Sequence, residues 1–149
     1  MLELSALKEK INEILNDYDN RLNPPVKKDE NVIAHYARRL FNSQKFFCGA
    51  RGRVRLETFR TNLRNDKSEK PADFLLNLFD LAFSERNAAY HSWLSEKILF
   101  FISNQVNLPR MLYQSAQIGH VLEPEGIYFE RVRERLAKIK ATPTLEAKH

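Results

Sequence analysis

The chain has 149 residues, of which 43% are hydrophobic and 29% are charged, and its formal net charge is +5. This size and balance predict one soluble globular domain and exclude wholesale disorder. No apolar run reaches the roughly 18 residues that a membrane-spanning helix needs, which excludes that class. The single cysteine, Cys48, cannot form an internal disulfide, so we expect a reducing, cytoplasmic location.

A set of apolar residues recurs at alternating spacings of three and four between residues 3 and 22, which predicts an amphipathic helix. The set is Leu4, Leu7, Ile11, Ile14 and Tyr18. The Asn23-Pro24-Pro25 stretch ends this helix. Its short length favours packing on its own domain, with homo-oligomerisation through residues 4–18 as the alternative.

A second amphipathic helix is expected from about Glu30 to between Phe41 and Phe46, with Asp29 as its N-cap. Helical spacing separates an apolar side, which we expect to face the core, from a polar outer side. The predicted inner residues are Val32, Ile33, Tyr36, Ala37, Leu40 and Phe41, and the outer residues are His35, Arg38, Arg39 and Asn42.

Two glycines three positions apart, Gly49 and Gly52, are expected to break the helical structure. The third helix is therefore predicted to begin just after Gly52 and to end near Asn65. Its apolar residues are Val54, Leu56, Phe59 and Leu63.

The segment from Phe74 to Ile102 is the most apolar part of the chain and is expected to be its centre. Pro71 suits the first turn of a helix there. The polar interruption 84–87 leaves open whether residues 71–105 form a hairpin of two helices or one long helix. Along the first half, a narrow polar stripe recurs at helical spacing and is expected to be exposed between helices or bonded to basic residues. It consists of Asp73, Asn77, Asp80 and Ser84.

Two further helices are expected downstream. Asn107 would cap the first, which has Pro109 in its first turn and ends at Gly119. The last starts at 123–125 and has a seam of apolar residues. That seam is Phe129, Val132, Leu136 and Ile139, and on the outer side Glu130 and Glu134 are expected to pair with Arg133 and Lys138. The loop between these helices is too long for a helix-turn-helix motif.

These elements predict an all-α fold: a single-domain bundle of six or seven helices around a buried central hairpin or long helix. The domain is expected to span residues 1–141. Residues 142–149 lack hydrophobic periodicity and contain Pro143, so they are expected to be a flexible tail.

Positive charge is concentrated between Arg38 and Arg64, where eight basic residues accompany one acid, a net of seven positive charges. With two glycines, this stretch is a candidate site for an anion or an acidic partner. The candidate residues are Arg38, Arg39, Lys45, Gly49, Arg51, Gly52, Arg53, Arg55, Arg60 and Arg64. A helix-to-helix turn flanked by solvated arginines is the alternative. The pattern differs from both the P-loop and the dinucleotide-binding fingerprint.

Candidate catalytic groups are few. Cys48 is more typical of a small buried hydrophobic residue than of a nucleophile, and the histidines have no metal-ligand spacing. We therefore expect no enzyme activity, metal or cofactor. The favoured hypothesis is a non-enzymatic helical adaptor, chaperone-like or regulatory protein that binds a protein partner, with a basic surface that favours an acidic one. The alternatives are nucleic-acid binding through the Arg38–Arg64 stretch and a small enzyme or binder of a phosphorylated ligand at Gly49–Arg55.

Overall fold

The computed structural model describes residues 2–24, 26–45, 49–89, 92–118, 121–122 and 126–141. It describes the backbone alone for residues 42–45, 49–51, 89, 117–118, 121 and 141. The seven helices found in these ranges are α1 (Leu4–Leu22), α2 (Val32–Lys45), α3 (Gly49–Asn65), α4 (Pro71–Ala89), α5 (Trp93–Gln105), α6 (Arg110–Ser115) and α7 (Ile127–Ala141). Two residue pairs, β1 (Gln117–Ile118) and β2 (Val121–Leu122), form a short antiparallel ladder. The predicted all-α single-domain fold is confirmed. The predicted tail, 142–149, lies outside the described residues.

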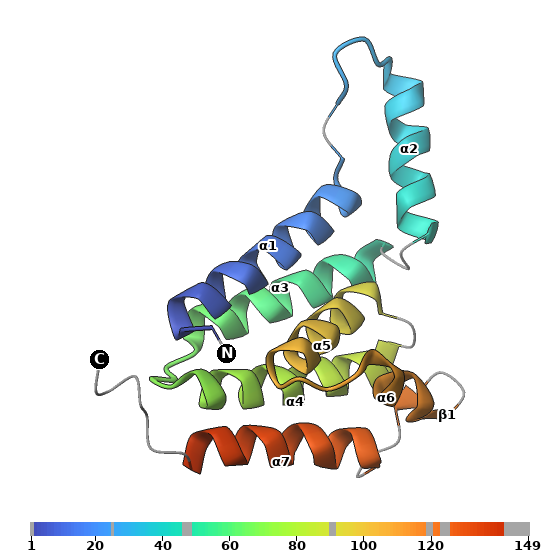
Figure 1. Ribbon diagram of the computed structural model, residues 1–149. Coiled ribbons are helices and arrows are strands. Elements are labelled where there is room, and N and C mark those ends of the chain that lie inside the picture. Colours follow the sequence, from blue (N-terminus) through green and yellow to red (C-terminus); the bar gives the residue numbers. More distant parts are fainter. Residues whose placement is uncertain are drawn as a thin grey trace.

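The first helix packs into the core of its own chain. Figure 1 shows α1 beside α3, with α5 and α4 below them in the view. The buried residues recur every three or four positions and are Leu7, Ile11, Leu15, Tyr18 and Leu22. The Tyr18 ring stacks on the Trp93 ring of α5, with 5.7 Å between centroids. The predicted seam is thus used for intramolecular packing, and the same face is unavailable for the alternative, dimerisation through residues 4–18.

The central apolar segment is a hairpin of two helices, α4 and α5, which pack closely on each other. The predicted interruption at 84–87 lies inside α4, which continues to Ala89. The second helix begins later, because the Ser92 hydroxyl accepts a hydrogen bond from the backbone N–H of Ser95 and caps α5. Its inner residues Leu94, Ile98, Leu99 and Ile102 are fully buried, as expected for the centre of the fold.

The last helix covers the opposite side of α4, and Figure 1 shows the two lying alongside each other. An aromatic cluster fills this interface: Phe79 and Phe83 of α4 meet Phe129 of α7, with ring centroids 5.7 Å and 5.1 Å apart. Tyr128 is also buried, and its hydroxyl lies 2.8 Å from that of Ser103. Burial raises the pKa of Tyr128, so this phenol stays neutral.

Three predicted helix starts are wrong. The α2 cap is Asn31, whose side chain accepts a hydrogen bond from the Ala34 N–H at 2.8 Å, in place of Asp29. Helix α3 begins at Gly49, so Gly52 is a helical residue and does not break the chain. Asn107 ends α5 and does not start the next helix: its φ of 58° is left-handed. The backbone N–H groups of residues 107 and 108 then bond back to α5 carbonyls, as in a Schellman cap.

Helix α6 is shorter than predicted, ending at Ser115 well before Gly119, which lies outside the described residues, as do 123–125. The short β ladder follows it. Asn87 of α4 holds this ladder: its side-chain amide donates to the Leu122 carbonyl at 3.1 Å and accepts from the Leu122 N–H at 2.8 Å. These two bonds occupy the edge of the ladder as a third strand would.

Candidate protein-interaction surface

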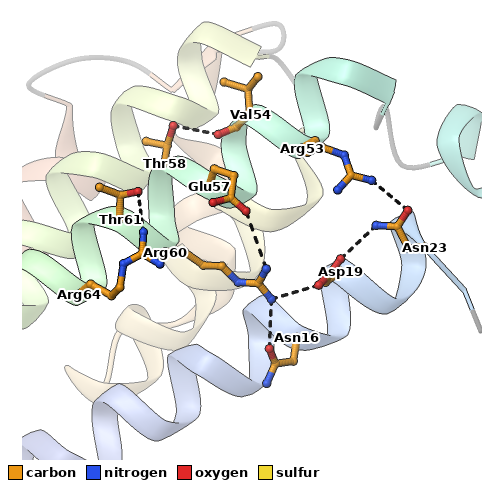
Figure 2. A network of polar contacts seen from close by, with 10 residues as sticks. All are labelled: Asn16, Asp19, Asn23, Arg53, Val54, Glu57, Thr58, Arg60, Thr61 and Arg64. Carbon is orange, nitrogen blue, oxygen red and sulfur yellow. Dashed lines mark hydrogen bonds and ion pairs between the residues drawn. The ribbon is translucent and has the colours of Figure 1, made fainter.

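The arginines of α3 reach across to α1. Figure 2 shows Arg60 pointing at α1, where it lies 3.1 Å from Asp19 and 3.3 Å from Asn16. Two helical turns earlier on the same face of α3, Arg53 donates to the Asn23 side-chain oxygen at 2.9 Å. Higher numbers on α3 thus meet lower numbers on α1, so the two helices are antiparallel. These arginines fasten α1 to α3.

The other residues of the basic stretch point elsewhere. Arg55 is only 7% exposed and so lies on the buried side of α3, whereas Arg53 is exposed. Two residues apart on a helix cannot share a face, which explains the divergence. Arg64 donates to Thr61 on its own helix, and Gly52 is buried within α3. The side chains of Lys45 and Arg51 and the surroundings of Gly49 lie outside the described part. Anion binding by this stretch therefore stays a prediction.

The polar side of α2 is tied to the segment that precedes the helix. The Arg38 guanidinium forms two hydrogen bonds with the Glu30 carboxylate, at 2.6 and 3.0 Å. Hydrogen bonding to Arg38 lowers the pKa of Glu30 to about 2 from an ordinary value of 4.5, so the carboxylate is ionised at neutral pH. The His35 ring nitrogen Nδ1 lies 3.3 Å from the same carboxylate. Arg39 also donates to Asn23, at 3.4 Å.

The apolar side of α2 faces solvent, contrary to prediction. In Figure 1, α2 projects from the bundle, whereas the other long helices pack side by side. The predicted inner side chains are between 60 and 81% exposed; these are Val32, Ile33, Tyr36, Leu40 and Phe41. The reason lies in the polar ties, because Glu30 and Asn23 hold the Arg38–Arg39 side of the helix against its own chain. Val54, one of the apolar residues noted in the third predicted helix, is likewise 65% exposed. We call Val32, Ile33, Tyr36, Ala37 and Leu40 the α2 apolar face.

Three residues of the polar stripe of α4 have partners, and two of them, Asp73 and Asp80, are bonded to basic residues as one of the two predicted arrangements required. Asp80 forms an ion pair with Arg133 of α7, and Asp73 forms one with Lys140 at 2.8 Å. Asn77 donates to the Ser68 hydroxyl at 3.3 Å. The helical spacing had predicted a pair between Arg133 and Glu130 of the same helix. Arg133 instead bonds across the interface to Asp80. The stripe joins α4 to α7.

A buried polar cluster joins three helices next to the ladder. Arg86 of α4 is fully buried, and its Nε donates both to Glu96 of α5 and to the Tyr113 hydroxyl of α6, each at 3.1 Å. Tyr113 in turn donates to Glu96 at 3.4 Å. Burial raises the pKa of Tyr113 to about 12, and the nearby Glu96 charge acts in the same direction. The phenol therefore remains a hydrogen-bond donor, and the cluster holds α4, α5 and α6 together.

Hollows on the described surface are shallow or polar. One cleft of about 380 Å³ lies between the end of α3 and α4 and is lined partly by Asn62, Asp66 and Asn77. In the described residues, no group of three or more His, Cys, Asp or Glu is arranged to hold a metal ion. Within the same ranges, no helix has both the length and the apolar character needed to cross a membrane. Cys48, His91 and His120 lie outside the described residues.

Comparison of the chain with protein-family models, with curated protein sequences and with solved structures finds no match.

We did not predict from the sequence which α1 side chains accept hydrogen bonds from the α3 arginines. Asn16, Asp19 and Asn23 follow one another at spacings of three and four, so they share one face of α1. Figure 2 shows all three on the side of α1 that meets α3. The signal was the recurrence of side-chain oxygens beside an apolar seam, opposite a helix rich in arginine.

Proposed function

We propose that this chain is a non-enzymatic helical adaptor or regulatory protein, and that the α2 apolar face binds a protein partner. The observation that carries the proposal is the orientation of α2. Its polar residues are engaged with the preceding segment, and Ile33, Tyr36 and Leu40 extend into solvent. A contiguous apolar patch of this kind on a soluble chain is typical of an interaction site.

The arrangement suits a helical ligand. Ile33, Tyr36 and Leu40 follow the i, i+3, i+7 spacing by which amphipathic helices recognise each other. A rigid aromatic side chain at the middle of the patch, Tyr36, is the residue type that most often dominates interface energy. The partner is therefore expected to contribute an apolar helical face.

The alternative of nucleic-acid binding, and the acidic character expected of a protein partner, receive less support. Arg38, Arg53 and Arg60 are engaged with carboxylate or amide oxygens of their own chain, which reduces the positive charge available to a polyanion or an acidic partner.

A cytoplasmic location is part of the proposal, because the one cysteine gives no support for an oxidising compartment.

Photo-crosslinking tests the proposal. A photoreactive benzoylphenylalanine replaces Tyr36 in the expressed protein, and after irradiation in the cell we expect a discrete adduct with a protein. The matched control places the same group at Met111 of α6, which is also exposed but lies outside the α2 apolar face. Combining Ile33→Ser with Leu40→Ser should abolish the Tyr36 adduct. Equal adducts at both positions, or none at Tyr36, would contradict the proposal.

A further inference from the structure

We infer that the partner of the α2 apolar face is a second copy of this chain, with two α2 helices pairing antiparallel about a two-fold axis between Tyr36 and Ala37. The inference rests on the proposed function and names the partner of the same surface. Its evidence is the pattern of large apolar positions along α2, which is symmetric about that axis although the residue types differ.

The order of residues about that axis is self-complementary. Val32 and Ile33 lie on one side, Leu40 lies at the matching position on the other, and Tyr36 and Ala37 lie at the centre. Antiparallel pairing places Ile33 opposite Leu40 of the partner subunit and Tyr36 opposite Ala37 of the partner subunit. Each copy thus presents the same patch to the other, as a two-fold interface requires. The match of a large side chain with a small one lets the helices approach closely.

The charges of α2 do not oppose this pairing. Arg38 lies on the other side of the helix from the Ile33–Leu40 line and is held by Glu30 of its own chain. Arg39 flanks the face and is directed toward Asn23. Like charges are therefore kept away from the axis. The symmetric pattern of apolar residues also favours a second copy of the chain, because an unrelated partner would not require it.

The exposed area fits a reversible dimer. Val32, Ile33, Tyr36 and Leu40 are between 61 and 81% exposed, which amounts to on the order of 500 Å² per copy. Burial of this patch in both copies reaches about 1,000 Å², the lower end of the range for specific interfaces. Affinity is then expected in the micromolar range, about 1–100 μM. The dimer should form and dissociate with concentration.

Sedimentation equilibrium measures this directly. The mass of the purified full chain should rise from 17.5 kDa toward twice that value as the concentration passes through the micromolar range. Ile33→Asp should weaken the dimer at least about tenfold, because it places a charge against Leu40 of the partner subunit. Val54→Asp is the matched control, since Val54 is similarly exposed but lies on α3, and it should leave the mass profile unchanged.

A mixing experiment tests the antiparallel order. Ile33→Asp and Leu40→Lys proteins should each be monomeric alone and should form a heterodimer when mixed, because the new carboxylate meets the new ammonium. Both positions are solvent-exposed in the monomer, so circular dichroism should show unchanged helix content in each variant. Failure of the mixture to associate would overturn the antiparallel arrangement.

The outcomes separate this inference from the proposed function. A monomeric mass up to about 200 μM overturns the homodimer, as this is above the expected dissociation constant. If photoreactive Tyr36 still gives a discrete adduct with a different protein, the proposed function stands. If the mass stays monomeric and no adduct forms, both are wrong. An Ile33→Asp variant that dimerises like the unmodified chain would place any interface elsewhere and overturn the inference.

Discussion

Replacement of Arg86 by methionine tests the importance of the buried polar cluster. The change keeps much of the side-chain length but removes the guanidinium, whose Nε donates to both Glu96 and Tyr113 at 3.1 Å. Glu96 then keeps only the 3.4 Å bond from Tyr113 among these contacts. Three helices that meet at this cluster lose a shared donor.

The size of the effect follows from burial. Removing one partner of a fully buried ion pair typically costs about 3–5 kcal/mol, because the other charge is left without its counter-ion. The Glu96 side chain is 29% exposed, so water replaces part of the lost interaction and the cost falls to the low end of this range or below it. We expect the free energy of unfolding to fall by about 2–3 kcal/mol for Arg86→Met. For a domain of this size the melting temperature should fall by about 5–10 °C.

Urea unfolding followed by circular dichroism at 222 nm gives the measurement. Asp17→Asn is the control: it breaks an exposed Arg21–Asp17 pair at a similar distance, 3.3 Å, and should cost less than about 0.5 kcal/mol. A double-mutant cycle of Arg86→Met with Glu96→Gln should show coupling of about 1–3 kcal/mol. A loss for Arg86→Met no larger than for the control, or strict additivity in the cycle, would refute the reasoning.

Two other changes have expected outcomes. Phe79→Ala should lower the free energy of unfolding by about 3–5 kcal/mol, because the ring is fully buried between Phe83, Tyr128 and Phe129. In the same urea assay, the control Val54→Ala should change the free energy of unfolding by under about 0.5 kcal/mol, because Val54 is exposed. Equal effects of the two substitutions would contradict the packing described. The folded-state pKa of Glu30, about 2, lies below its ordinary value of 4.5, so its tie to Arg38 stabilises α2 fully above pH 4.5 and is lost as pH falls toward 2. Backbone NMR shifts of residues 32–41 should therefore change over this pH range in the unmodified chain, and an unchanged profile in Glu30→Gln would show that another group titrates.

The elements of the fold were largely predictable, but the orientation of α2 was not. Hydrophobic periodicity shows which side chains share a face, and for α1 it led correctly to a buried seam. For α2 the same periodicity was right about the helix and wrong about the direction in which the face points. That direction depends on a pairing between Glu30 and Arg38 eight positions apart, across the helix start, which no helical spacing rule contains.

The basic stretch illustrates a second limit. Counting arginines located a concentration of charge but could not show that Arg60 meets Asp19 about forty positions away, or that Arg55 points inward. Opposite charges on distant elements become neighbours only through tertiary packing. The break between α4 and α5 is different, because the capping serine at position 92 was visible in the sequence. The polar run 84–87 drew attention instead and left the choice between one helix and two open.

The stack of Tyr18 on Trp93 has a consequence for synthesis of the chain on the ribosome. The apolar seam of α1 is completed by α3 and α5, and about 70 residues separate the end of α1 from Trp93. At typical translation rates these residues take about 4–14 s to add, during which the apolar seam of α1 lacks the neighbours that α5 supplies. The apolar seam of nascent α1 is therefore incompletely covered until α5 has been synthesised.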